Sequence, residues 1–375
     1  MGNRKEILSK VKRVVVKIGS NVLATPDINL DDNVVNRISA DLSKVMDQGY
    51  KVVVVSSGAI LAGRAKLGLK ERPRLVRQKQ AVAAVGQSTL MRTYEKNMER
   101  FGKRVAQILL TDGDMTNRQR YINARNTLET LFGYGVLPIV NENDTVAVEE
   151  IKFGDNDTLS GVVSQLVEAD LLIILSDVDG LYTADPNKNP DARFIPLVET
   201  INQEIYAAAK ETPSVIGIGG MTTKIRAAQT AARSGIICII VNGRIPDIVS
   251  RLLAGEELGT LFLAQEDKLN CRKCWIAFTL KPQGSLIVDE GAYKALKEEK
   301  KSLLPSGIKD VKGSFDAGDA VTIITEDGKE FARGLANYSS LEINKIKGVK
   351  SRFLEQILGY CAAAEVVHRD NLAIL

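Results

Sequence analysis

The sequence predicts an α/β protein: a mostly parallel sheet sandwiched by helices, with a small β-rich barrel domain after it. Strand-like and helix-like segments alternate along residues 1–265, which favours a parallel sheet with helices on both faces. Short strands with closely spaced glycine turns follow. The length of 375 residues exceeds the size at which one hydrophobic core keeps growing, so two domains are expected.

Six short runs of β-branched residues or leucine are predicted as strands of the first domain. They have the composition of strands that are buried on both faces of a sheet. Between them apolar residues repeat at helical spacing, as from Val34 to Met46 and from Leu159 to Val167. The predicted strands are Val14–Ile18, Val52–Val55, Val105–Leu110, Val136–Val140, Leu171–Leu175 and Ile236–Val241.

The pattern changes after Leu263. Residues 266–280 are predicted as a linker between a first domain of residues 1–265 and a second domain of residues 281–375. In the second domain, short apolar runs such as Val321–Ile324 are separated by turn signals such as Asp327-Gly328.

Composition and charge are those of an ordinary globular protein. Apolar residues make up 45% of the chain and charged residues 26%. The net charge of +4 gives no reason to expect a nucleic-acid or membrane partner, and no apolar stretch predicts a signal peptide or a membrane span. Four cysteines are too few for a disulfide scaffold, so we expect a cytoplasmic protein.

Five polar motifs stand at the ends of predicted strands or the starts of predicted helices. Because the carboxyl ends of neighbouring strands line one crevice, motifs that are far apart in sequence can meet there. Two lysines, several carboxylates and glycine-rich backbone suit a phosphorylated ligand that carries magnesium. The motifs are Lys17-Ile18-Gly19-Ser20, Ser56-Ser57-Gly58-Ala59, Asn141-Glu142-Asn143-Asp144, Gly154-Asp155-Asn156-Asp157 and Gly219-Gly220-Met221-Thr222-Thr223-Lys224.

Lys17 and Lys224 are the candidate phosphate-binding cations. Lys17 ends a strand, and Lys224 lies about one turn into a helix that a glycine pair opens, where backbone amides and the helix dipole favour anions. Each motif alone also fits a simpler interpretation: a surface lysine, an ordinary turn, or a helix capped by Asn156 or Asp157. The Walker A pattern is absent from the sequence, so an ordinary P-loop is excluded.

A basic stretch runs from Arg64 to Lys79. It could attract anionic substrates or form a subunit contact, but we favour a solvated loop around Pro73.

The motifs, in this order, resemble those of the amino-acid kinase family, and Ser176-Asp177-Val178-Asp179-Gly180 adds to the resemblance. The C-terminal part, with Leu303-Leu304-Pro305-Ser306-Gly307-Ile308 and Tyr338-Ser339-Ser340, is similar to the PUA domain. Together the two resemblances cover nearly the whole chain. Within the family, they point to the members that phosphorylate the γ-carboxylate of glutamate, the first step of proline biosynthesis.

The resemblance implies ATP and Mg²⁺ as cofactors, with the metal held mainly by the ATP phosphates and no protein ligand assigned to it. It assigns catalysis to Lys17, Lys224 and Asp157, the carboxylate that orients the two lysines. It assigns glutamate binding to Ser57, Asp144 and Asn156. The implied ATP-binding residues are Lys17, Ser176, Asp177, Ile218, Gly219, Gly220, Met221, Thr222, Thr223 and Lys224. Ile218 and Ser176 stand where relatives commonly carry threonine.

Elementary chemistry agrees with this assignment. A glutamate carboxylate, with a reference pKa of about 4.3, is already ionised at neutral pH and needs no general base, which suits a chain with one histidine. A free α-ammonium group needs an anionic partner, which Asp144 could supply, so glutamate is favoured over N-acetylglutamate. Two alternatives remain: an N-acetylglutamate or aspartate kinase, and a non-catalytic sensor of ATP and an amino acid with an RNA-associated PUA domain.

Further partners follow from the resemblance alone. It implies proline as a feedback inhibitor, a homodimer or homotetramer, and a reductase that consumes the acyl phosphate. Residues 281–375 contain 14 Lys and Arg against 14 Asp and Glu, so we expect weak RNA binding or none.

Overall fold

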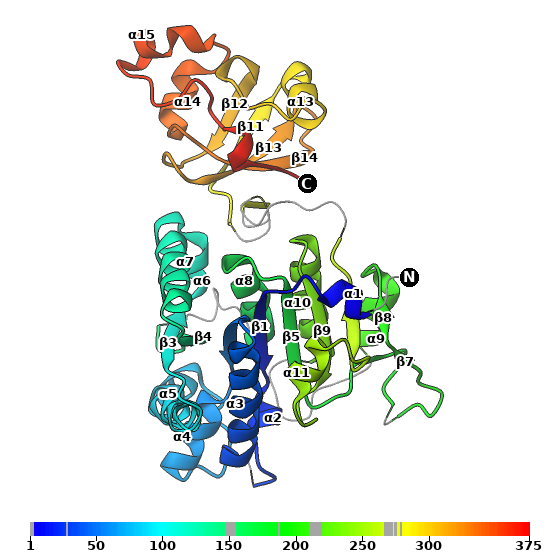
Figure 1. The fold of residues 1–375 in the computed structure, drawn as a ribbon. Coiled ribbons are helices and arrows are strands. Elements are labelled where there is room, and N and C mark those ends of the chain that lie inside the picture. Colours follow the sequence, from blue (N-terminus) through cyan, green and yellow to red (C-terminus); the bar gives the residue numbers. More distant parts are fainter. Residues whose placement is uncertain are drawn as a thin grey trace. The chain divides into compact units, whose positions relative to one another are not determined.

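The structure is a computed structural model, and it describes residues 4–27, 29–146, 155–186, 188–210, 220–265, 273, 276–277 and 280–375. The chain divides into two compact units (Figure 1). One comprises Met1–Met115 and Gln119–Lys268, and the other Thr116–Arg118 and Leu269–Leu375. The linker predicted at residues 266–280 and the two predicted domain boundaries stay predictions.

The first unit is built on an eight-stranded sheet with the order β3-β4-β2-β1-β5-β9-β10-β8. All six predicted strands are present, each within a residue or two of its predicted bounds. The described pairings are parallel except that of β10 with β9, so the prediction of a mostly parallel sheet is confirmed. The strands are β1 (Arg13–Ile18), β2 (Lys51–Ser56), β3 (Val105–Leu110), β4 (Leu137–Glu142), β5 (Leu171–Ser176), β8 (Leu197–Val198), β9 (Ile237–Asn242) and β10 (Thr260–Phe262).

Helices cover the two faces of this sheet. Apolar residues of α3 (Asp32–Asp47), α5 (Val76–Glu99) and α11 (Ile248–Leu253) share one buried core with Val14, Val16 and Ile18 of β1. Because side chains alternate along a strand, Lys17 faces the other way, toward α8 (Asn156–Leu166) and α10 (Met221–Arg233). The unit also contains α1 (Arg4–Leu8), α2 (Ser20–Leu23), α4 (Ala59–Leu67), α6 (Asp112–Thr116), α7 (Arg118–Gly133), α9 (Gln203–Lys210) and the pair β6 (Leu181–Tyr182) and β7 (Phe194–Ile195).

The register of β1 is fixed at both ends. At the amino end, Oδ2 of Asp170 accepts hydrogen bonds from the backbone amides of Lys12 (2.8 Å) and Arg13 (2.9 Å). At the carboxyl end, Ile18 lies beside Ser56 of β2 and Leu175 of β5. The three central strands therefore end level with one another, and their polar motifs begin at the same edge.

Helices α4 and α5 cross with their backbones in contact. A Cβ atom at Gly63 would lie 1.9 Å from the carbonyl oxygen of Val82, and one at Gly86 would lie 1.8 Å from that of Ala59. Only glycine fits at these two positions. The crossing holds α4, which directly follows the Ser57-Gly58 motif, in a fixed place at the edge of the sheet.

The second unit contains a mixed five-stranded sheet with the order β12-β11-β13-β14-β15, in which only β11 and β13 pair in parallel. Its core includes Leu286, Ile323, Tyr338 and Val367, all nearly inaccessible to solvent. The prediction of a small β-rich second domain is confirmed. Its elements are β11 (Gly284–Val288), α13 (Glu290–Lys297), η3 (Pro305–Gly307), β12 (Ile308–Gly313), β13 (Ala320–Thr325), β14 (Glu330–Leu335), α14 (Ser340–Ile346), η4 (Ser351–Phe353), α15 (Leu354–Leu358), η5 (Arg369–Asn371) and β15 (Leu372–Ile374).

Among the helices in the described ranges, none combines the length and the apolar composition needed to cross a bilayer.

Candidate active site

A cavity of about 200 Å³ lies at the carboxyl ends of the central strands. Its wall comes from the ends of β1, β2, β4 and β5 and from the first turns of α2, α4, α8 and α10. The predicted site residues that line it are Lys17, Ser57, Asp144, Asn156, Asp157, Ser176, Asp177 and Lys224. The structure thus brings residues from six separate motifs to one cavity.

The remaining predicted residues belong to the segment that leads into α10. Gly220 is the N-cap of α10, so the helix begins at Met221, as the glycine pair predicts. Thr222 and Thr223 are partly buried in the first turn. Ile218 and Gly219 lie outside the described residues.

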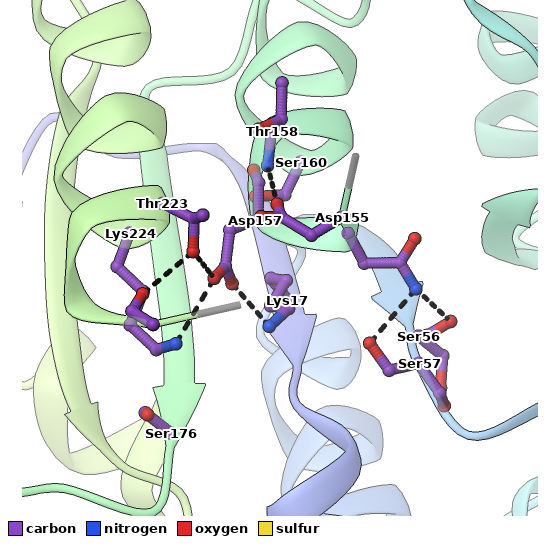
Figure 2. Close-up of polar contacts among 12 residues, drawn as sticks. Lys17, Ser56, Ser57, Asp155, Asp157, Thr158, Ser160, Ser176, Thr223 and Lys224 are labelled. Atoms are coloured by element: carbon purple, nitrogen blue, oxygen red, sulfur yellow. Dashed lines mark hydrogen bonds and ion pairs between the residues drawn. The ribbon is translucent and has the colours of Figure 1, made fainter. Parts of the chain in front are cut away.

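Asp157 joins the two lysines. Its Oδ1 forms an ion pair with Nζ of Lys17, and its Oδ2 lies 3.2 Å from Nζ of Lys224 (Figure 2). The hydroxyl of Thr223 donates a hydrogen bond to the same Oδ2 at 2.8 Å, the third contact of this carboxylate. The side chains of Lys17, Asp157 and Lys224 are only 7%, 1% and 9% exposed, so this group of charges is held in place away from bulk water.

The electrostatics of Asp157 follow from these contacts. Burial alone would raise its pKa, but the positive charges of Lys17 and Lys224 outweigh burial and lower the pKa to about 2. The carboxylate therefore stays ionised at neutral pH. The group of two lysines and one aspartate carries a net charge of +1, an arrangement that suits a transferring phosphoryl group.

Asn156 connects three motifs on the other side of the cavity. Its Nδ2 atom donates to the hydroxyl of Ser57 at 3.0 Å, to the carbonyl oxygen of Ser56 at 3.1 Å and to Oδ1 of Asn141 at 2.9 Å. This network fixes the hydroxyl of Ser57 beside the cavity. Asn156 is not the helix cap, so the simpler interpretation of Asn156 as an N-cap is wrong.

Asp155 caps α8 instead. Its Oδ1 accepts a hydrogen bond from the backbone amide of Thr158 at 2.8 Å (Figure 2). Burial, followed by repulsion from Asp157, raises the pKa of Asp155. The alternative of a cap by Asp157 is likewise wrong, because that carboxylate contacts the lysines.

Asp177 follows β5 and is held by two neighbours. Nδ2 of Asn21 donates to its Oδ2 at 2.7 Å, and the hydroxyl of Ser176 donates to its Oδ1 at 3.1 Å. Burial raises the pKa of Asp177, yet these hydrogen bonds outweigh burial and lower it. Sequence reasoning missed Asn21, although its place three residues after the strand that ends at Ile18 was a usable signal.

Two arginines of the basic stretch also line the cavity. Arg64 lies in α4 and is half-buried, so the interpretation of this stretch as a solvated loop is wrong for Arg64. Arg72 is exposed on the loop after α4 but still contributes to the wall. The available signal was spacing: Arg64 lies seven residues after Ser57, or two turns of a helix that starts at the same motif.

The fold, the cavity and its charged residues define a protein of the amino-acid kinase class. The family model described as "Amino acid kinase family" matches residues 12–242, and the model described as "PUA domain" matches residues 284–358. The chain belongs to the amino acid kinase family. Both resemblances predicted from the motifs are confirmed.

Full-length relatives indicate which members of the family the chain is similar to. The chain is 51% identical over 372 residues to "Glutamate 5-kinase" of Pelobacter propionicus, which covers 99% of this chain and 100% of that protein. It is 52% identical to "Glutamate 5-kinase" of Geobacter sulfurreducens, with the same coverage. The predicted resemblance to the members that act on glutamate is therefore confirmed over the full length.

Solved structures agree on the fold. "Carbamate kinase from Giardia lamblia bound to AMP-PNP" matches with a TM-score of 0.50 and 20% identity, covering 68% of this chain and all of that one. At this identity the match supports the fold alone.

Proposed function

We propose that the chain transfers the γ-phosphoryl group of ATP to the γ-carboxylate of L-glutamate, which yields glutamate 5-phosphate in the first step of proline biosynthesis. The observation that carries this proposal is the buried Lys17–Asp157–Lys224 group at the edge of the sheet. The full-length identity to glutamate 5-kinases supports the choice of acceptor.

The reaction needs little covalent help from the protein. The γ-carboxylate is ionised at neutral pH and attacks the γ-phosphorus directly, while the bond from that phosphorus to the β,γ-bridging oxygen breaks and ADP leaves. Lys17 and Lys224 stabilise the negative charge on the transferring group, and Asp157 keeps the two ammonium groups in position. We assign the opposite wall, with Ser57, Asn156 and the carboxylate of Asp144, to the binding of glutamate.

We assign ATP to the side of the cavity formed by Ser176, Asp177 and the first turn of α10. Mg²⁺ would arrive with the phosphates and neutralise part of their charge. Carboxylate oxygens suit this ion, and Asp177 is better placed to hold it than Asp157, both of whose oxygens contact lysines. Among the described residues, no group of three or more His, Cys, Asp or Glu side chains could hold a metal by itself.

Several finer expectations accompany the proposal. The cytoplasmic location, the homodimer or homotetramer, feedback inhibition by proline, a partnership with glutamate-5-phosphate reductase and the weak binding of RNA all stay predictions. An N-acetylglutamate kinase is disfavoured because acetylation removes the charge that the carboxylate of Asp144 would pair with.

The proposal is tested by trapping the acyl phosphate with hydroxylamine. The protein is incubated with ATP and Mg²⁺ and either glutamate, N-acetylglutamate or aspartate, and hydroxamate and ADP are measured. We expect hydroxamate from glutamate alone, its loss in Lys224→Ala, and normal turnover in Lys10→Ala, a control at an exposed lysine outside the cavity wall. Binding of ATP and glutamate without ADP formation would support the sensor alternative instead.

A further inference from the structure

Arg64 is a cationic residue of the cavity wall, and no acidic side chain among the described residues forms an ion pair with it. Four cationic residues line the cavity: Lys17 and Lys224, which share Asp157, and Arg64 and Arg72. Arg64 forms no ion pair with any residue that the structure describes. The contact of its guanidinium group is a hydrogen bond from Nη2 to the carbonyl oxygen of Lys70 at 2.7 Å.

The position of Arg64 is fixed by packing. Gly63, its neighbour in α4, lies so close to α5 that a Cβ atom there would be 1.9 Å from the carbonyl oxygen of Val82. The bond to Lys70 restrains the guanidinium group at its other end. Arg64 is therefore a positioned arginine on the same helix that begins beside Ser57, and it adds charge to the wall that we assign to glutamate.

Charge matching identifies the ligand of this arginine. Glutamate carries two carboxylates and one ammonium group. In the proposed reaction the γ-carboxylate lies toward Lys17 and Lys224, and the ammonium group toward Asp144. The α-carboxylate then still needs a cation, because a carboxylate that loses water without a charged partner is costly. A planar guanidinium group suits a carboxylate, which it can bind through two parallel hydrogen bonds.

We infer that Arg64 binds the α-carboxylate of glutamate and so selects substrates that carry a free carboxylate at that carbon. This inference rests on the proposed function. Arg64 takes no part in the phosphoryl transfer itself, so its loss should weaken substrate binding and leave the chemical step nearly unchanged.

The test compares glutamate with its α-carboxamide analogue, which keeps the γ-carboxylate and the ammonium group. Hydroxamate formation is measured for the wild type, Arg64→Met and Arg64→Lys, with Arg92→Met as a control at an exposed arginine of α5. In Arg64→Met we expect the KM for glutamate to rise about 10- to 100-fold, as for one lost charge-assisted contact, with kcat and the KM for ATP nearly unchanged. Arg64→Lys should recover part of the loss, and Arg92→Met should match the wild type.

The ratio of the two substrates separates recognition from a merely structural role. If Arg64 binds the α-carboxylate, the wild type prefers glutamate to the α-carboxamide, and this preference shrinks in Arg64→Met by the same factor as kcat/KM for glutamate. An equal loss for both substrates would overturn the inference, since it would mean that the mutation only disturbs the cavity. An unchanged KM for glutamate would also overturn it and would leave the α-carboxylate to backbone amides.

The same hydroxamate assay distinguishes failure of the proposed function from failure of this inference. A wild type that makes no hydroxamate from glutamate would remove the proposed function and this inference together. If the wild type phosphorylates glutamate, and Arg64→Met prefers glutamate to the α-carboxamide as strongly as the wild type does, only the inference is overturned.

Discussion

Gly86→Ala should force apart the two helices that position the glutamate side of the cavity. The new Cβ atom would lie 1.8 Å from the carbonyl oxygen of Ala59 and 2.3 Å from the backbone nitrogen of Gly63. Both neighbours are backbone atoms, so no side chain can rotate away to make room. To bring the shorter contact to 3.0 Å, α4 and α5 must separate by about 1.2 Å.

This displacement lowers the free energy of unfolding. Overpacking a close-packed site costs about 1–3 kcal/mol, and two backbone clashes at one atom place Gly86→Ala at the upper end, about 3 kcal/mol. For a unit of this size, each kcal/mol lowers the unfolding midpoint by about 2–4 °C, so we expect a decrease of about 6–12 °C. Differential scanning fluorimetry measures the midpoint. Since α4 carries Arg64 and follows Ser57, the KM for glutamate should rise as well.

The matched control is Gly133→Ala. Gly133 ends α7, and a Cβ atom there meets nothing within 4 Å. This substitution should leave the midpoint unchanged or raise it, because alanine favours a helix by about 1 kcal/mol over glycine. If Gly86→Ala unfolds at the wild-type temperature, the close contact between α4 and α5 is refuted.

Three further outcomes follow from the buried charges and one buried cap. Asp157→Asn should lower kcat at least about 100-fold in the hydroxamate assay, because Lys17 and Lys224 lose the carboxylate between them, and a near-normal kcat would contradict the bridging role. The pKa of Asp157 falls from 3.8 to about 2 on folding, which corresponds to a stabilisation of about 2 kcal/mol that is present above about pH 4 and lost as the pH falls toward 2. The midpoints of wild type and Asp157→Asn, measured by circular dichroism, should therefore converge over that range, and a constant gap would contradict the lowered pKa. Asp41→Ala should lower the free energy of unfolding, measured by urea denaturation, by about 1–3 kcal/mol, because this buried carboxylate accepts hydrogen bonds from two backbone amides at the start of α11. The exposed control Asp27→Ala should leave it unchanged.

Much of the first unit was predictable because its strands are buried on both faces. Runs such as Val52–Val55 permit few other structures, and the glycine pair before Met221 marked the start of α10 correctly. The meeting of Lys17, Asp157 and Lys224 was also expected, since the ends of parallel strands share one edge.

Other features were hidden because they depend on tertiary contacts. A helix cap depends on which of three adjacent polar residues points back to the backbone, and the pattern Asp155-Asn156-Asp157 does not distinguish them. The place of Arg64 in the cavity wall was missed because the basic stretch was interpreted as a loop, whereas α4 continues as far as Leu67. The crossing of Gly63 and Gly86 joins two helices and has no local sequence signal beyond the glycines themselves.

The two hydrogen bonds that Asp170 accepts from β1 also affect the position of Lys17 at the carboxyl edge of the sheet. Val14, Val15 and Val16 are identical, but a slip of the strand by two residues would carry Lys17 or Arg13 to the fully buried position of Val15. Polar groups outside that run favour the native alignment: Asp170 accepts hydrogen bonds from two backbone amides at one end, and Lys17 pairs with Asp157 at the other. The position of Lys17 is thus set in part by the carboxylate that accepts from Arg13, which lies four residues, or about 13 Å, back along β1. Asp170 therefore helps to fix the register of β1. Substitutions of Asp170 should displace Lys17, although Asp170 itself does not line the cavity.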